Sequence, residues 1–295
     1  MRNLLPVLSV VAGIATFSAM DAAIKGASMA VGVFTALALR NLLGTLLTVP
    51  LWMGAGRPLP SRKALRVHLQ RSATTAGMAL LFFYGLVRIP LAEGIAISFI
   101  APIIALYLAA VMLGERIHPR AIIAALLGIL GVLVIAAGRF GSGAASDETT
   151  AGTAAILCSA VLYAFNLVLQ RRQALLAGPV EIALFQNGIV TLIFFAFAPW
   201  FLVRPDAGAM AMILAGAVLA TAALLFLSWG YARAEAQVLV PIEYTGFLWA
   251  ALFGWLMFDE QVDAGTLAGA VLIAIGCWIA ARNRRDPTTL KVPTP

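Results

Sequence analysis

The chain has 295 residues, of which 62% are hydrophobic and only 11% are charged, and its formal net charge is +7. A soluble domain carries about 25% charged residues, so this composition excludes a soluble globular protein and indicates an integral membrane protein. In such proteins an excess of basic residues is typical of cytoplasmic loops. No nucleic-acid-binding module is visible, so no nucleic-acid partner is expected.

Ten apolar segments follow one another along the chain, separated by charged loops or by loops with Pro and Gly. Each is long enough to cross about 30 Å of hydrocarbon as a helix. The first is not read as a cleaved signal peptide, because it has a counterpart later in the chain. The sequence therefore predicts an all-α integral membrane protein with ten transmembrane helices, at residues 4–25, 32–53, 72–88, 92–113, 120–138, 151–171, 179–203, 209–230, 236–257 and 264–281.

Basic residues collect on one side of this predicted topology. Ten spans put both termini on the same side, and most of the 20 Lys and Arg residues fall there, including the run Arg57–Arg71 and the tail that starts at Arg282. Cytoplasmic loops carry such an excess. We therefore expect a multi-pass protein of the cytoplasmic (inner) membrane of a bacterium, with both termini in the cytoplasm.

The chain also repeats itself at a shift of 145 residues. "YGLVR" (Tyr84–Arg88) aligns with "WGYAR" (Trp229–Arg233), and "LGE" (Leu113–Glu115) aligns with "FDE" (Phe258–Glu260). Five spans per copy is an odd number, so the second copy enters the membrane from the opposite side, as in many secondary transporters. The predicted units are an inverted pair of five-helix repeats, residues 1–145 and 146–285, followed by a cytoplasmic tail, 286–295.

One stretch of each repeat resembles a known family. "LGERIHPRAIIAALLGILGVLVI", echoed by "FDEQVDAGTLAGAVLIAIGCW", looks like the EamA repeat of the drug/metabolite transporter superfamily. Within that superfamily the chain looks most like the YddG-type exporters of aromatic amino acids. The resemblance implies a ten-helix transporter without a universal catalytic residue, so it assigns a fold and a class of activity but no site.

The repeat pairs the polar residues that lie inside the spans. At the shift of 145, four polar residues of the first copy align with polar residues of the second: Asp21 with Asn166, Lys25 with Gln170, Asn41 with Gln186 and Ser98 with Glu243. By depth in the membrane, the polar residues form an outer and an inner layer. The outer layer is expected to contain Asp21, Arg40, Asn41 and Ser98, and the inner layer Asn166, Gln186, Asn187 and Glu243.

Glu243 is the most unusual member, because it is a carboxylate within the otherwise apolar run "QVLVPIEYTGFLWAALFGWLMF". Such a residue must face a partner or water. One interpretation places it on a central polar path for substrate. The other makes it a structural carboxylate that ties helices together by hydrogen bonds.

Charged residues of the first two spans suggest an ion pair. Arg40 has a candidate partner in Asp21, and the pair is interpreted as structural or as part of a gate, in preference to substrate contact. Lys25 lies one turn beyond Asp21 on the same helix face, and its side chain is expected to reach the outer surface.

Aromatic and proline residues complete the candidate path. Aromatic rings near the polar layers could stack on a solute, although packing or interfacial anchoring is the alternative, above all for Trp229. Prolines within the fourth and ninth spans permit kinks and are candidate hinges, although kinks also occur without motion. These residues are Tyr84, Tyr163, Trp229 and Tyr244 for the path, and Pro102 and Pro241 for the hinges.

The function classes can be ranked from what the chain contains. No constellation of an enzyme, a metal site or a cofactor motif is visible; His68 and His118 are placed in loops and are not spaced as metal ligands. A scaffold has no need of an inverted repeat. We therefore expect no cofactor and no enzyme, but a secondary transporter exporting amino acids and related metabolites through a central cavity. A drug or organic-cation/proton antiporter of the same fold stays open, and the partners expected are a small-molecule substrate, the lipid bilayer and, at most, a second copy.

Overall fold

The computed structural model describes residues 5–54, 56, 59–101, 103–105, 107–108, 119–141, 146–174, 176–231 and 245–281. In these ranges the regular secondary structure is helical, and each predicted span contains a helix, which confirms the all-α prediction. The helices are α1 (Leu5–Val31), α2 (Val33–Gly54), α3 (Arg62–Leu86), α4 (Leu91–Ser98), α6 (Pro119–Gly141), α7 (Asp147–Ala174), α8 (Pro179–Phe195), α9 (Ala198–Phe201), α10 (Ala207–Tyr231), α12 (Thr245–Phe258) and α13 (Ala264–Ala281).

Several of these helices have the length and the composition of membrane spans. Within the described residues, four combine sufficient length with high hydropathy: α1, α2, residues 147–170 of α7 and residues 207–227 of α10. α3 begins at Arg62, ten residues before the predicted start of its span, because Ser61 caps it by accepting a hydrogen bond from the Ala64 amide at 3.1 Å. Its first turns therefore carry basic residues on an extension of the helix.

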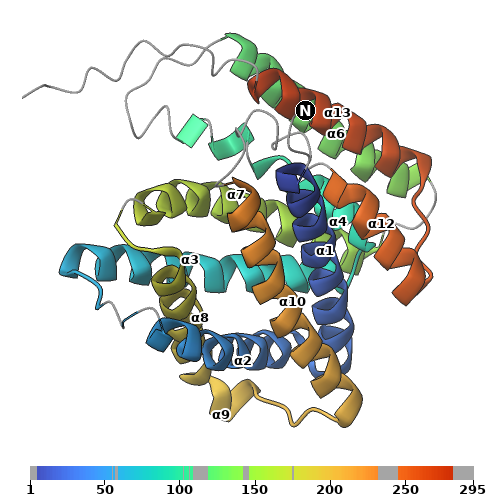
Figure 1. The fold of residues 1–295 in the computed structure, drawn as a ribbon. Helices are drawn as coiled ribbons and strands as arrows, with labels where there is room; N and C mark the ends of the chain where they lie inside the picture. The colour runs from blue at the N-terminus through green and yellow to red at the C-terminus, as the bar shows by residue number, and fades with distance from the viewer. Residues whose placement is uncertain are drawn as a thin grey trace, which may run out of the picture.

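The helix pairs obey the symmetry that the repeat predicts. The most extensive contacts join α1 to α10, α6 to α13, α3 to α7 and α2 to α8 (Figure 1). Exchanging the two copies turns the pair α1–α10 into α7–α3, and turns α2–α8 and α6–α13 into themselves. This is the pattern of a two-fold axis that relates the repeats, as in an inverted-repeat transporter.

The same contacts divide eight helices into two groups of four. The "α1 bundle" consists of α1, α2, α10 and α12, and the "α7 bundle" consists of α7, α8, α3 and α4. The repeat operation exchanges α1, α2 and α10 with α7, α8 and α3. The two bundles meet mainly where α2 packs on α8 and where α4 packs on α12.

The remaining pair, α6 and α13, lies side by side along one edge of the molecule (Figure 1). A Cβ atom added to Gly131 would lie 2.7 Å from the Gly269 carbonyl oxygen, and one added to Gly269 would lie 2.5 Å from the Gly131 carbonyl oxygen. Two glycines thus allow the backbones to touch, as small residues do at interfaces between membrane helices. Their outer faces carry exposed apolar side chains such as Leu126 and Leu267.

Candidate functional site: polar contacts at the bundle boundary

The two ends of the helix bundles differ in charge. The "basic side" is the end where α3 begins with Arg62, Lys63 and Arg66, and where α7 ends and α8 begins. The "opposite side" is the end where α1 ends, α4 begins and α12 ends. Polar side chains are buried at both ends and also halfway between them.

At the opposite side, Lys25 forms a buried ion pair with Glu260. The Lys25 side chain is only 3% exposed, and its Nζ contacts Glu260 Oε1 and donates a hydrogen bond to the Ile89 carbonyl oxygen at 2.8 Å. The other carboxylate oxygen of Glu260 accepts a hydrogen bond from the Leu91 amide at 2.7 Å. Lys25 Nζ also lies 5.0 Å from the ring centre of Phe258.

The expectation that Lys25 reaches the outer surface is therefore wrong. A lysine extends to water when nothing inside offers a counter-charge. Here the loop after α12 supplies a carboxylate, and the turn before α4 supplies a carbonyl oxygen, so the ammonium is fully engaged inside the protein. Ile89 and Leu91 belong to the α7 bundle, whereas Lys25 belongs to the α1 bundle. This "outer latch" of Lys25, Glu260, Ile89 and Leu91 consequently joins the two bundles.

A second carboxylate lies next to the outer latch. Glu93, in the first turn of α4, is 1% exposed and shares with Glu260 a small cavity that Gly254 and Thr266 also line. A glutamate is this deeply buried only where the protein provides a role or a partner for it. Glu93 was not among the predicted site residues, although it is a carboxylate at the start of the predicted span 92–113.

At the basic side, Arg71 is the centre of a network that joins α3, α7 and α8. Its Nε donates to Asn166 Oδ1 at 3.1 Å, and its Nη1 donates to Gln173 Oε1. Asn166 in turn donates to Thr75 Oγ1 at 2.6 Å. Tyr163 is close enough to Arg71 to interact with its charge. Asn166, a residue of the predicted path, is thus part of the network, and the exposed Tyr163 lies beside it in α7 and interacts electrostatically with Arg71.

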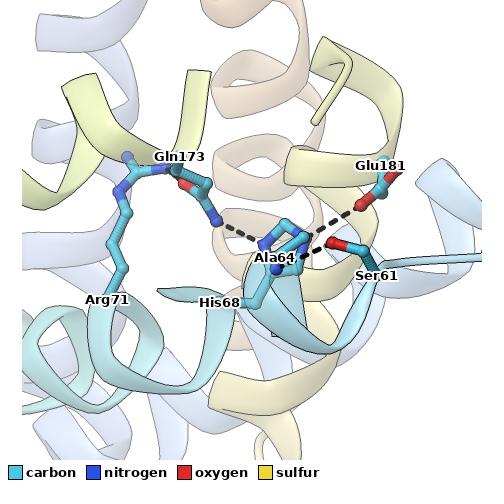
Figure 2. Close-up of polar contacts among 6 residues, drawn as sticks. All are labelled: Ser61, Ala64, His68, Arg71, Gln173 and Glu181. Carbon is cyan, nitrogen blue, oxygen red and sulfur yellow. Dashed lines mark hydrogen bonds and ion pairs between the residues drawn. The ribbon is translucent and has the colours of Figure 1, made fainter. Parts of the chain in front are cut away.

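The network continues from Gln173 to a histidine and a glutamate (Figure 2). Gln173 Nε2 contacts His68 Nδ1, and His68 Nε2 lies 3.0 Å from Glu181 Oε1. A guanidinium can only donate, so the Gln173 oxygen accepts from Arg71 and its amide hydrogen points to His68. His68 therefore accepts at Nδ1 and donates from Nε2 to Glu181, and every hydrogen bond in the chain runs from Arg71 towards Glu181.

The position of His68 corrects a further expectation. His68 was placed in a loop, but it lies in α3, is fully buried and stacks on the ring of Phe185 at a centroid distance of 5.1 Å. The reason is the early start of α3, which carries the basic run into the helix. All the side chains of this "basic-side network" (His68, Arg71, Thr75, Tyr163, Asn166, Gln173 and Glu181) belong to the α7 bundle.

Halfway between the two ends, α2 and α8 meet through polar side chains. The hydroxyls of Thr45 and Thr191 are 3.3 Å apart and share a hydrogen bond. These residues are 146 apart in sequence, so nearly equivalent positions of the two repeats touch each other at the symmetry axis. A Cβ atom added to Gly44 would lie 3.1 Å from the Asn187 side chain, so the amide packs directly on the α2 backbone.

Other members of the predicted layers flank this contact. Asn41 is buried one turn before Thr45 and donates to the Leu37 carbonyl oxygen of its own helix at 2.7 Å. Gln186 precedes Asn187 in α8, and its Oε1 is buried without a hydrogen-bond partner among the described residues. The structure thus brings Asn41, Gln186 and Asn187 to the two helices that form the boundary between the bundles.

Asp21 and Arg40 lie in neighbouring helices of the α1 bundle. Asp21 is buried and Arg40 is partly buried, and their charges interact electrostatically. Neither of the ion pairs within 4.0 Å among the described residues joins them, since these are Lys25–Glu260 and His68–Glu181. The role of Asp21 and Arg40 as a gate or structural pair stays a prediction.

The remaining described candidates lie apart from both networks. The Tyr84 ring is 41% exposed and stacks under the Arg88 guanidinium at 3.6 Å, at the end of α3. Ser98 Oγ donates to the Gly94 carbonyl oxygen of its own helix at 2.9 Å. Trp229 is 40% exposed near the end of α10. Glu243, Tyr244, Pro102 and Pro241 lie outside the described residues.

Comparison with known proteins identifies the family. The pattern of the EamA-like transporter family matches this chain twice, over residues 4–137 and again over residues 150–282. The chain belongs to the EamA-like transporter family. A solved crystal structure with a TM-score of 0.65 and 20% sequence identity covers 95% of this chain and 99% of its own, which supports the same fold.

The relatives of this transporter are named for different transported compounds. The pseudopaline exporter CntI of Pseudomonas aeruginosa is 31% identical over 273 residues, covering 92% of this chain and 93% of the relative. A riboflavin transporter of Brucella anthropi is 22% identical over 89% of this chain and 93% of the relative. An S-adenosylmethionine uptake transporter of Rickettsia felis is 23% identical over 66% of both chains. These names do not single out aromatic amino acids, so the likeness to YddG-type exporters stays a prediction.

Proposed function

We propose that this EamA-like transporter exports amino acids and related small metabolites by alternating access between the α1 bundle and the α7 bundle. The observation that carries the proposal is the exchange of these two bundles by the repeat symmetry, together with the outer latch that joins them at one end. Symmetry of this kind gives a transporter two nearly equivalent arrangements, open to opposite sides.

The direction of export rests on the orientation of the chain. The basic side carries Arg62, Lys63 and Arg66 and, at the end of α7, Arg172. By the bias of cytoplasmic loops for Lys and Arg, this side faces the cytoplasm of a bacterial inner membrane, and both termini lie there. A reporter that is active only outside the cytoplasm, fused after Pro295, then stays silent.

One feature supports export as the direction of transport, and another supports amino-acid-like substrates. The relative that is 31% identical is named an exporter, which makes this direction of transport the first to test. The basic-side network offers a guanidinium, amides and the Tyr163 ring at the proposed cytoplasmic end. Aromatic and other neutral amino acids are the first substrates to test, because a ring face can stack on their side chains.

The test is uptake of a panel of labelled amino acids into inside-out vesicles or proteoliposomes, with and without a pH gradient. Export from a cell corresponds to uptake by inside-out vesicles. We expect uptake above that of protein-free vesicles for at least one amino acid. If no member of the panel is taken up under either condition, the proposal is wrong.

A drug or organic-cation/proton antiporter is the second candidate function. The buried carboxylates of Asp21 and Glu93 favour it, because carboxylates inside a membrane are typical of proton-coupled cation transporters. Tetraphenylphosphonium in the same vesicles separates the two functions. Uptake of this cation driven by a pH gradient, without uptake of any amino acid, would favour the antiporter.

A further inference from the structure

Arg71 is a cation that the described protein leaves without a counter-charge. Its two bonded partners, Asn166 and Gln173, are neutral amides, and neither of the ion pairs in the described part of the chain involves it. Its second terminal nitrogen, Nη2, has no protein acceptor among these residues, although the side chain is partly buried. A guanidinium in such a place is complementary to a carboxylate or a phosphate.

The fold itself does not require this cation. The position equivalent to Arg71 at the repeat shift of 145 is Gly216 in α10. There the space is filled by an apolar contact, because a Cβ atom on Gly216 would lie 2.4 Å from Ile24 Cδ1. One repeat thus packs this junction with glycine and isoleucine, whereas the other places a charged side chain there. The difference points to a role beyond holding α3 against α7.

The network also holds the guanidinium in one orientation. Asn166 and Gln173 each use their oxygen on Arg71, and each amide nitrogen is engaged by Thr75 or His68. Glu181 anchors the far end of the chain through His68 at 3.0 Å. Arg71 is thereby fixed by groups that cannot neutralise it, with Tyr163 close by, at the end of the bundle that faces the cytoplasm in the proposed orientation.

We propose that Arg71 is the carboxylate-recognition residue for the exported metabolite at the cytoplasmic entrance, with Nη2 as its free donor and Asn166 and Gln173 as positioning residues. The inference rests on the proposed function for the direction of transport. It adds the substrate class, because a substrate bound here carries a free carboxylate. Amides, esters and decarboxylated amines of the same compound are then poor ligands.

The experiment measures binding separately from transport. The purified full chain is titrated with L-phenylalanine and with L-phenylalaninamide, and with L-leucine and L-leucinamide, and binding is followed by thermal unfolding in detergent. We expect the wild type to bind at least one acid about 10- to 100-fold more tightly than its amide, the range for a hydrogen bond to a charged group. Arg71→Gln brings this preference close to one, and Arg71→Lys gives an intermediate preference.

A matched control lies on the same helix. Arg66 is an exposed arginine of α3, and Arg66→Gln should leave the acid preference at the wild-type value. If Arg71→Gln does not fold, the preference in Arg71→Lys decides, because this variant keeps the charge and loses the planar fork. Equal loss of acid and amide binding would make Arg71 a structural residue and overturn the proposal, as would a wild type that binds acid and amide equally.

The other source of an anion is a lipid headgroup. Wild type and Arg71→Gln are therefore compared in nanodiscs of phosphatidylcholine with and without phosphatidylglycerol. If Arg71→Gln loses stabilisation by phosphatidylglycerol and keeps the acid preference, Arg71 binds lipid and the proposal is overturned. Acid-specific binding that depends on Arg71 supports the inference even where vesicles show no amino-acid uptake, whereas that absence of uptake refutes the proposed function alone.

Discussion

The opposite side and the basic side of this transporter use buried charges in different ways. At the opposite side, Lys25 and Glu260 neutralise each other, and they bond to Ile89 and Leu91 across the boundary between the bundles. At the basic side, the hydrogen bonds of Arg71 stay within the α7 bundle, and its charge is not neutralised by a described residue. Contacts across the boundary at one end must break when the bundles separate at that end, whereas contacts within one bundle can persist. The first arrangement suits a gate and the second suits a binding site.

The largest effect is expected from locking the opposite side. A Cβ atom on Gly254 of α12 would lie 3.5 Å from Leu91 Cβ of α4, which is within the range for a disulfide. In a background without the two native cysteines, Gly254→Cys with Leu91→Cys therefore joins the two bundles. We expect oxidation to abolish transport and reduction to restore it, measured as initial uptake into vesicles.

A control disulfide lies at the same end within one bundle. A Cβ atom on Gly152 of α7 would lie 2.9 Å from Arg88 Cβ in the turn after α3, so Gly152→Cys with Arg88→Cys crosslinks the α7 bundle to itself. Its oxidation should leave most of the transport intact. The two single variants Gly254→Cys and Leu91→Cys report on any displacement of Glu260 Oε2, which lies 2.8 Å from the added Cβ of residue 254. Full transport with the Leu91–Gly254 disulfide formed would show that this end does not open.

The next largest effect is expected from breaking the outer latch. Lys25→Met leaves the Glu260 carboxylate without its counter-charge, and breaking a buried ion pair typically costs about 3–5 kcal/mol. We expect a large loss of folded yield and of thermal stability in detergent. Adding Glu260→Gln to Lys25→Met removes the remaining charge and should recover much of the loss. A double variant that is less stable than both single variants would contradict a mutual neutralisation of Lys25 and Glu260.

A smaller effect is expected for Asp21 and Arg40, whose charges interact without an ion-pair contact. Asp21→Asn and Arg40→Gln should each lower the folded yield, and the double variant should lose less than the sum, with a coupling of about 0.5–3 kcal/mol. Denaturation of the four proteins in the same detergent measures it. Strictly additive losses would show that Asp21 and Arg40 do not stabilise each other. The outer latch would then be the principal charged contact of the opposite side.

The comparison also shows what the sequence could predict. Hydropathy and length predicted ten spans, each of which contains a helix among the described residues, and the shift of 145 residues predicted the symmetry of the contacts, because both depend on regular patterns along the chain. The buried environment of Lys25 could not be predicted from these patterns. Its partner Glu260 is 235 residues distant and approaches only when α1 and α12 pack together. The general tendency of a lysine in a membrane helix to extend to the surface therefore predicted the wrong environment for Lys25.

Arg71 was missed for a local reason. It was counted among the basic residues of a loop, whereas the Ser61 cap starts α3 at Arg62 and turns the Arg71 side chain towards Asn166 of α7. Asn166 itself was predicted, because the repeat pairs it with Asp21. A helix cap followed by basic residues was visible in the sequence, but only the packing of α3 on α7 shows which of these residues is buried.

The smallest effect is expected at the symmetry axis, halfway between the two ends, where α2 packs on α8. Thr45 and Thr191 share one hydrogen bond between neutral hydroxyls, and such bonds between membrane helices contribute about 0.6 kcal/mol on average. Thr45→Val, Thr191→Val and the double variant keep the shape of the side chains and remove only this bond. We expect a coupling of about that size in a double-mutant cycle of unfolding, with initial uptake rates close to wild type. A pivot keeps its contact in both arrangements of the bundles, so its loss stabilises neither one. If instead Thr45→Val and Thr191→Val change the uptake rate as strongly as Lys25→Met does, the contact between α2 and α8 differs between the two arrangements, and the axis is part of the gate.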